Sequence, residues 1–175
     1  AREGRFTKSG EPKTLEPFAA SSIPLVTLGT FLLWFGWFGF NGFSQLAMGT
    51  FDDVNAISKI AVNTHLAGAS GTVTAAVVSR LLGGKTDIIM MLNGALAGLV
   101  AITAEPLTPT PLLAIVIGAI GSVIMYFGTK FLEARHLDDV VGAIPVHMFA
   151  GIFGTLIVPI SNPSTNFGTQ FTGVI

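Results

Sequence analysis

Five long apolar stretches, separated by short polar segments, make up most of this chain. They cover approximately residues 23–48, 57–82, 88–104, 112–132 and 138–160. A bilayer core is roughly 30 Å thick and a helix rises roughly 1.5 Å per residue, so these lengths suit membrane-crossing helices. The pattern predicts an all-α integral membrane protein, with about five transmembrane helices in a helical repeat spanning residues 21–162.

The segments on either side of the predicted helices are polar. Residues 1–20 hold seven charged side chains and two prolines, without the apolar run and cleavage site of a signal peptide. They are predicted to be a loop before the first helix. The polar residues 163–175 are predicted to be a loop that is truncated, on the opposite side of the membrane.

Composition supports the membrane prediction and excludes several classes of function. Half of the residues are apolar, 11% are charged and the mean hydropathy is +0.70, whereas a soluble domain carries about 25% charged residues. The net charge of −1 gives no basic surface for nucleic acid, and the absence of cysteine excludes disulfides and thiolate chemistry. Because the sequence also lacks metal-ligand clusters, catalytic motifs and phosphate-binding glycine loops, neither an enzyme nor a cofactor is expected.

Lysine and arginine fall almost entirely on one side of the predicted helices. Eight lie in residues 1–20 and in the loops near 80–87 and 130–139, whereas Lys59 alone lies on the other side. Cytoplasmic loops retain such residues. Residues 1–20 are therefore predicted to be cytoplasmic and residues 163–175 extracytoplasmic, in a multi-pass protein of the cell (plasma) membrane.

Small residues mark candidate contacts between helices. Gly94 and Gly98 form a GxxxG pattern in the third stretch, and Gly118 and Ser122 form a similar small-residue pair in the fourth. Such pairs let two backbones approach closely in lipid. They predict tight helix packing and need no further function.

His147 is the candidate functional residue with the sharpest signal. It lies inside the fifth stretch, flanked by Ala143 and Gly151 at four-residue spacing. Ionisable groups at membrane depth are costly and mark ion or proton pathways, although a hydrogen bond between helices is an equal alternative. His65, inside the second stretch, is interpreted as a structural residue that makes a hydrogen bond.

Trp37, Phe40 and Ser44 share one face of the first predicted helix, at positions i, i+3 and i+7. Two aromatic rings and a hydroxyl can hold a small cation, with a cation–π attraction of about 2 kcal/mol once water is removed. The alternative is an aromatic belt at the membrane border, which physics alone favours.

Four segments together resemble the C-terminal repeat of the ammonium transporter (Amt/Rh) family. They are WFGWFGFNG (34–42), NTHLAGASG (63–71), GGKTDIIMMLNGALAGLVAIT (83–103) and DDVVGAIPVHMFAGIFGTL (138–156). They occur in the family's order and with its spacing. The resemblance implies helices six to ten of eleven, that is, one half of an inverted-repeat transporter.

The resemblance also implies roles for individual residues and for partners. Trp37 and Ser44 match an outer site that recruits ammonium, Phe40 matches a gate phenylalanine, and His147 matches a pore histidine. The expected substrate is ammonium or ammonia, with methylammonium as analogue. The expected assembly is a homotrimer of the full-length protein in the lipid bilayer, with a PII-type protein as a possible regulator.

The sequence departs from the family pattern at two positions and leaves other functions open. Gly142 stands five residues before His147, where many members carry aspartate, and Phe43 stands where a small residue is usual. One alternative function is an ammonium sensor coupled to a signalling module. Another is a subunit that does not transport, in which His147 is structural.

Overall fold

The computed structural model describes Phe6 and residues 20–175, and residues 20–175 are mainly helical. The predicted loop at residues 1–20 lies outside this part of the chain, apart from Phe6 and Ala20. The elements in order are α1 (Ile23–Phe43), α2 (Phe51–Gly83), α3 (Ile88–Thr103), α4 (Pro111–Ala134), the π-helical segment η1 (Ile144–Phe149), α5 (Ala150–Ser161) and α6 (Phe167–Val174).

The prediction of an all-α membrane protein is confirmed, and each apolar stretch contains a helix. In residues 20–175, four spans are long and apolar enough to cross a membrane, with η1 and α5 counted as one span of 18 residues. Helix α3 is shorter, at 16 residues, which gives it a length of about 24 Å.

Four predicted boundaries were wrong. One of them is the start of the fifth predicted helix, where η1 begins at Ile144 instead of 138 because Gly142 has a left-handed φ of +74°. Helix α1 ends at Phe43 instead of 48, and α2 begins at Phe51 instead of 57. The early start of α2 comes from a capping box, in which the Thr50 hydroxyl accepts the Asp53 N–H and the Asp53 carboxylate accepts the Thr50 N–H. The predicted loop at 163–175 contains α6, because the Asn166 side chain accepts the Thr169 N–H and starts a helix.

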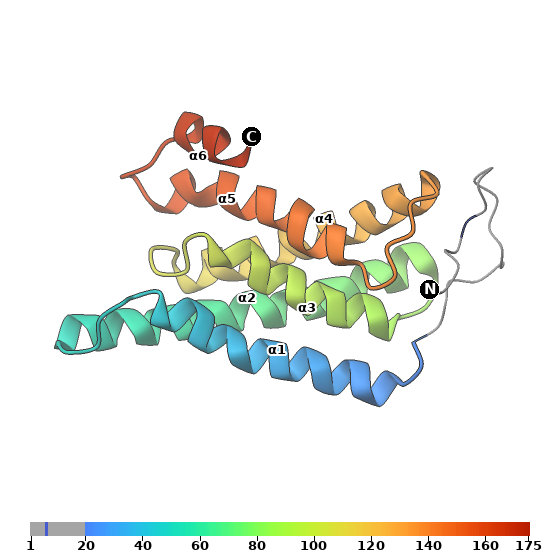
Figure 1. Cartoon of the computed structure of the whole chain (residues 1–175), viewed down its shortest axis with the longest axis horizontal. Helices are drawn as coiled ribbons and strands as arrows, with labels where there is room; N and C mark the ends of the chain where they lie inside the picture. The colour runs from blue at the N-terminus through green and yellow to red at the C-terminus, as the bar shows by residue number, and fades with distance from the viewer. Residues whose placement is uncertain (1–5, 7–19) are drawn as a thin grey trace.

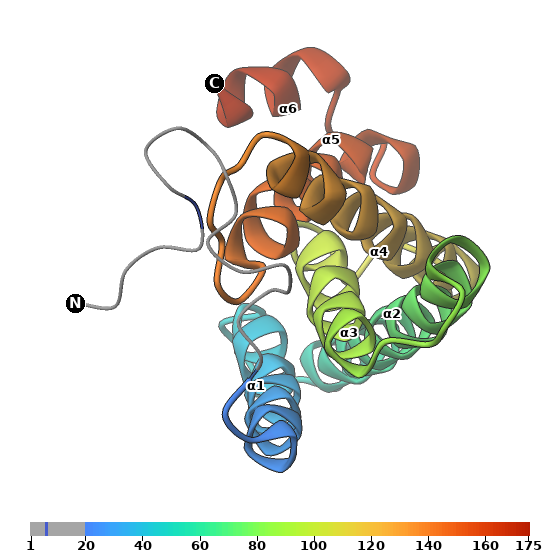
Figure 2. The same ribbon diagram turned by 90° about the vertical axis from the view of Figure 1, so that its right-hand side faces the viewer.

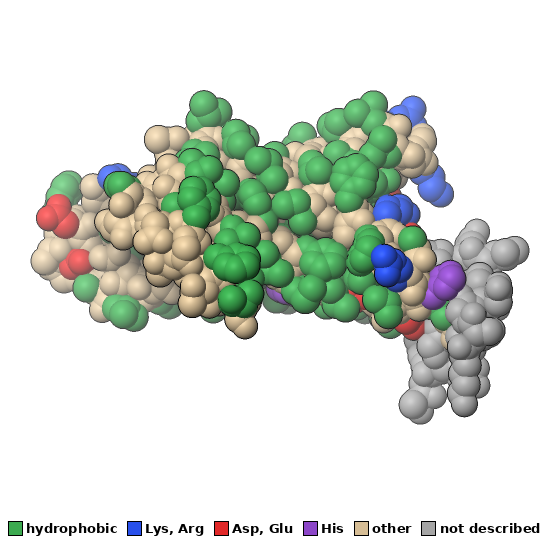
Figure 3. Space-filling model, turned by 90° about the horizontal axis from the view of Figure 1, so that it is seen from above, with side chains coloured by type: hydrophobic (Ala, Val, Ile, Leu, Met, Phe, Trp, Pro, Cys, Tyr) green, Lys and Arg blue, Asp and Glu red, His purple; other side chains and the backbone are tan. Residues whose placement is uncertain are grey.

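Successive helices run in opposite directions along the long axis (Figure 1). The α2–α3 and α4–α5 connections lie at one end, while the α1–α2 and α3–α4 connections and α6 lie at the other. Among residues 20–175, the first end carries four basic residues (Arg80, Lys85, Lys130 and Arg135) and the second carries Lys59. The alternation of loops assumed from the sequence is therefore present, and the charged side chains gather at the two ends of an apolar surface (Figure 3).

Helices α2, α3 and α4 pack tightly on one another at glycine positions. The backbones of Gly71 and Gly94 touch, Gly98 lies on Ala67, and a Cβ atom on Gly118 would lie 2.6 Å from the Cα of Ala67. The Ser122 hydroxyl donates to the carbonyl of Gly71 at 2.8 Å. The predicted packing pairs in the third and fourth stretches therefore make helix contacts.

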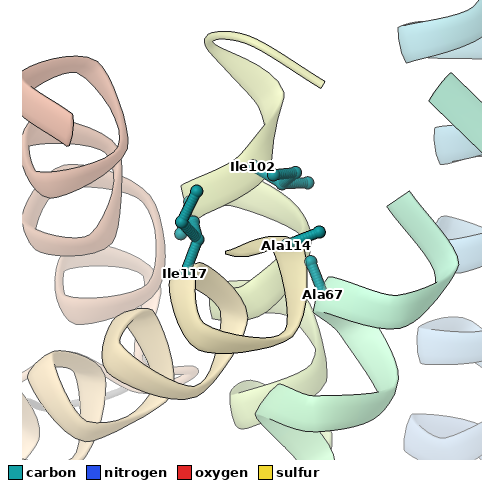
Figure 4. Packing of buried hydrophobic residues seen from close by; sticks show 5 residues of the cluster. Ala67, Ile102, Ala114 and Ile117 are labelled. Atoms are coloured by element: carbon teal, nitrogen blue, oxygen red, sulfur yellow. The ribbon is translucent and has the colours of Figure 1, made fainter. Parts of the chain in front are cut away.

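Two small clusters of buried side chains complete this packing. Ala67, Ile102, Ala114 and Ile117 meet between α2, α3 and α4 (Figure 4). The second cluster joins Met125 of α4 to Val146 of η1 and Ala150 of α5. The segment that carries His147 is thus held against α4 by burial of apolar side chains.

Helix α2 is much longer than a bilayer core requires. Its 33 residues give a length of about 50 Å. Within α2, the buried amide of Asn63 donates to the carbonyls of Pro106 and Pro109 at 2.9 and 2.8 Å. This contact fixes the α3–α4 connection beside α2 at the level of Asn63, so the turns of α2 before Asn63 extend past that connection (Figure 1).

Helix α1 is set apart from α5. It contacts α2 and α3, whereas α5 contacts α3, α4, η1 and α6. Seen from the end, α1 and the η1–α5 segment stand on different sides of α3 (Figure 2). Side chains from α1, α3 and the η1–α5 segment line a common cavity.

Candidate functional site

A cavity of about 620 Å³ occupies the space between α1, α3 and the η1–α5 segment. Its lining is mostly apolar. The lining residues are Leu32, Leu33, Gly36, Trp37, Phe40, Val100, Thr103, Ala104, His147, Gly151 and Thr155. Three of the four site residues predicted from the sequence, Trp37, Phe40 and His147, thus line one cavity.

A hydrogen bond fixes the indole ring of Trp37 in the cavity wall. Its Nε1–H donates to the hydroxyl of Thr103 at 2.7 Å, and that hydroxyl donates to the carbonyl of Leu99 at 2.6 Å. The Trp37 ring meets Phe40 edge to face, with centroids 5.9 Å apart. Because its N–H is already bonded, Trp37 offers a bound solute its π surface and not a hydrogen-bond donor.

The side chain of Phe40 is largely free of contacts in this chain. Phe40 is 64% exposed, although it lines the cavity beside Trp37. A phenyl ring in this position can narrow or cover an opening next to the indole.

His147 projects from the π-helical segment η1, and its side chain is exposed in the cavity. The backbone there departs from an α-helix, because the N–H of Ala150 reaches the carbonyl of Pro145, five residues earlier, as well as that of His147. Single turns of π-helix are frequent at functional sites. An imidazole at this point can accept or donate a proton in otherwise apolar surroundings.

Ser44, the fourth predicted site residue, is not part of the cavity lining. It is the residue after the last turn of α1, and its hydroxyl donates to the carbonyl of Phe40 at 2.8 Å. Ser44 is connected to the cavity through the backbone of Phe40. The structure therefore does not bring all four predicted residues into one cluster.

His65 lies in a different place, where α1 packs on α2. Its imidazole is 5.5 Å from the ring of Trp34 and 6.2 Å from that of Phe38, measured between centroids. The contacts that the structure gives His65 are thus aromatic, whereas a hydrogen bond was predicted. His65 is not among the residues that line the cavity.

Residues 20–175 and Phe6 hold no group of three or more side chains that could bind a metal ion. The chemistry available in the cavity is that of two aromatic rings, an imidazole and two threonine hydroxyls in an apolar wall. Such a wall can remove water from a small solute, attract a cation through π faces and exchange a proton at one point.

Comparison with known proteins decides the family. The model of the Ammonium Transporter Family matches residues 2–173. The chain belongs to the ammonium transporter family. The resemblance inferred from four short segments is thereby confirmed, and a family of transporters agrees with the prediction that the chain is not an enzyme.

Individual relatives support the assignment. The ammonium transporter Amt2 of Archaeoglobus fulgidus is 45% identical over 159 residues, which are 91% of this chain and 32% of that protein. The solved structure of a protein named Sensor Amt Protein is 34% identical, with a TM-score of 0.85, over 97% of this chain and 43% of that one. The crystal structure of Candida albicans Mep2, at 23% identity and a TM-score of 0.84 over 98% of this chain and 41% of that one, shares the fold.

The chain spans about a third of the length of the curated Archaeoglobus relative that it matches. Its similarity to the two solved structures covers nearly the whole chain. The 175 residues therefore correspond to a part of the fold of such a protein.

Thr103 and Thr155 are cavity residues that sequence reasoning missed. Thr103 is the last residue of α3 and Thr155 lies in α5, where each follows a run of apolar or small residues. A single hydroxyl in an apolar helix gives little signal, since threonine can bond the carbonyl four residues earlier in any helix. The available signal was the place of Thr103 at the end of a segment that carried the family resemblance.

Replacing Thr103 with valine is expected to destabilise the protein. Valine keeps the shape but leaves the half-buried Trp37 N–H without its acceptor, which costs about 1 kcal/mol, the lower end of the penalty for a buried donor. Thermal unfolding in detergent should show the loss, and Thr103→Ser, which keeps the hydroxyl, should lose much less. Equal unfolding temperatures for Thr103→Val and the wild type would show that this hydrogen bond contributes nothing.

Proposed function

We propose that this chain is one repeat of a longer transporter that moves ammonium or ammonia across a membrane. The observation that carries the proposal is the cavity in which Trp37, Phe40 and His147 meet, in a chain that belongs to the ammonium transporter family. The same three residues were selected from the sequence before their positions were known.

The physical chemistry of the lining supports separate roles for the two aromatic rings and for the imidazole. A bare cation in an apolar pore is costly, whereas neutral ammonia is not. The π surfaces of Trp37 and Phe40 attract ammonium by about 2 kcal/mol in a dry site. His147 then provides a proton acceptor and donor where the wall is otherwise apolar. The solute is proposed to shed its proton before it crosses beside this imidazole.

The rest of the full-length protein is proposed to close the cavity. The chain spans 32% of the Archaeoglobus relative, and the cavity wall in this chain comes from α1, α3 and η1–α5 alone. An inverted second repeat facing these helices would complete a narrow pore, with Ser44 in an outer recruitment site. Residues 1–175 by themselves are predicted not to transport, and uptake by this fragment in liposomes would contradict the proposed half-pore.

The proposal also covers the assembly, the partners and the membrane orientation of the full-length protein. It is proposed to be a homotrimer in the plasma membrane, with methylammonium as an analogue substrate and a PII-type protein as a regulator. Residues 1–20 are proposed to be cytoplasmic, since α1 begins at the end of the bundle that carries four of the five described basic residues, and cytoplasmic ends retain such residues.

Uptake of ammonium by the purified full-length protein in proteoliposomes tests this function. Uptake well above that of empty liposomes, and competition by methylammonium, are the expected results. Ammonium binding without uptake would instead support the sensor alternative, which the name of the similar Sensor Amt Protein also suggests. Neither binding nor uptake would contradict both functions.

A further inference from the structure

The backbone that leads into the His147 segment is irregular. Gly142 has a φ of +74°, a left-handed conformation that favours glycine. Two residues later η1 begins with π-helical geometry, and it contains Pro145, which has no N–H to donate. The first turn keeps one ordinary helical bond, from the Val146 N–H to the Gly142 carbonyl at 3.2 Å, and contacts from outside the turn add to it in setting its position.

Asp139 supplies one of these outside contacts. Its two carboxylate oxygens accept the N–H groups of Ala143 and Ile144 at 2.9 and 2.8 Å. These bonds satisfy the first free N–H groups of the segment. Asp139 belongs to the same connection as the segment, however, so it cannot tie that segment to another helix.

Asn93 supplies a hydrogen bond that crosses to another helix, in addition to the packing of Val146 near Met125 of α4. From the second turn of α3, its Nδ2 donates to the carbonyl of Val141 at 3.1 Å. A Cβ atom built on Gly142 would lie 2.7 Å from the same Nδ2, which is closer than real Cβ contacts allow. The amide of Asn93 therefore rests directly on Gly142, and any larger residue there would push it away.

The chemistry of Asn93 indicates that this contact is specific. Asn93 is half-buried, and its amide makes a directional bond to one backbone carbonyl at a distance typical of a well-formed N–H···O bond. Here the bonded partner is the backbone five to six residues before His147. The same helix, α3, supplies Val100 and Thr103 to the cavity, so Asn93 connects one wall of the cavity to the segment that carries the imidazole.

We infer that Asn93 is a positioning residue for His147, which it acts on through Val141 and the left-handed Gly142. This inference rests on the proposed function only where transport is the readout. Loss of the hydrogen bond between Asn93 and Val141 allows the first residues of η1 to shift, and His147 shifts with them. Small displacements of a positioned group lower rates by up to about 100-fold, so a fall in transport of about tenfold is expected for Asn93→Leu.

The first test follows His147 directly and needs no transport. In full-length protein labelled with ¹⁵N-histidine, the imidazole signal of His147 is identified by its absence in His147→Ala. Leucine is nearly equal in size to asparagine and suits an apolar helix. Asn93→Leu is expected to change the chemical shift of this signal. The matched control is Asn63→Leu, which removes amide-to-carbonyl bonds at the other end of the bundle and should leave the signal in place. An unmoved signal in Asn93→Leu would overturn the inference.

The second test is a double-mutant cycle on the uptake rate. Asn93→Leu should lower uptake about tenfold in the wild type but less than about twofold in the His147→Ala background, because a group that acts through His147 has no effect once His147 is gone. An equal fold decrease in uptake in the wild type and in the His147→Ala background would overturn the inference. Absence of uptake in the wild type would instead contradict the proposed function, and the histidine signal would still decide the role of Asn93. If Asn93→Leu does not fold, Gly142→Ala displaces the same amide and takes its place in both tests.

Discussion

Replacing His147 with alanine in the full-length protein is expected to leave only a residual or unselective ammonium transport. The imidazole is the one ionisable side chain among the residues that line the cavity. Without it, a solute that has lost its proton meets only apolar groups and hydroxyls. Proton transfer by a positioned side chain is worth on the order of 100-fold or more in rate. Uptake by proteoliposomes should fall by that order, or become unselective between ammonium and other monovalent cations.

His65→Ala is the matched control for this experiment. It removes the same side chain from the interface between α1 and α2, where the imidazole contacts Trp34 and Phe38 outside the cavity lining. Uptake by this variant should stay near that of the wild type. If His147→Ala transported as well as His65→Ala, His147 would be structural and the proposed pore chemistry would be wrong.

Replacing Gly118 with alanine is expected to give the largest loss of stability among the glycine positions of α4. The added Cβ would lie 2.5 Å from the hydroxyl of Ser70 and 2.6 Å from the Cα of Ala67. Because a backbone atom cannot rotate away, α4 must move off α2. Overpacking of this kind costs about 1–3 kcal/mol and can cost more. The yield of monodisperse protein in detergent and its unfolding temperature should both fall.

The matched control for Gly118 is Gly29 in α1. A Cβ on Gly29 meets nothing within 4 Å, so Gly29→Ala adds a methyl group without a clash. Alanine favours a helix over glycine by about 1 kcal/mol, so this variant should be as stable as the wild type or slightly more stable. Equal behaviour of the two alanine variants would show that α2 and α4 are not in close contact at Gly118.

The pattern of apolar residues was sufficient to predict the helices but not all of their ends. Helix α2 begins with Asp52 and Asp53 in its first turn, ahead of the apolar stretch predicted at 57–82. The capping box formed by Thr50 and Asp53 is a local signal that the hydrophobic pattern does not contain. Helix α6 was missed for the same reason, since it is short and begins at the polar residue Asn166.

The cavity could be predicted in part. Periodicity placed Trp37 and Phe40 on one helix face, and depth in the membrane selected His147, but only the family resemblance connected the two helices. The structure brings these three residues into one cavity and leaves Ser44 outside its lining. Thr103 escaped notice because its role depends on the Trp37 indole, a partner 66 residues away. The π-helical turn at His147 has no sequence signature comparable to the long apolar stretch that marks a membrane helix.

The length of α2 has a practical consequence for imaging the protein. Asn63 holds the α3–α4 connection at its own level, and the 12 residues from Phe51 to Val62 add about 18 Å of helix beyond it. A detergent micelle covers the apolar part of a transporter and leaves few fixed features by which single particles can be aligned. The capped end of α2 supplies such a feature, and it offers an antibody fragment a helical epitope away from the cavity.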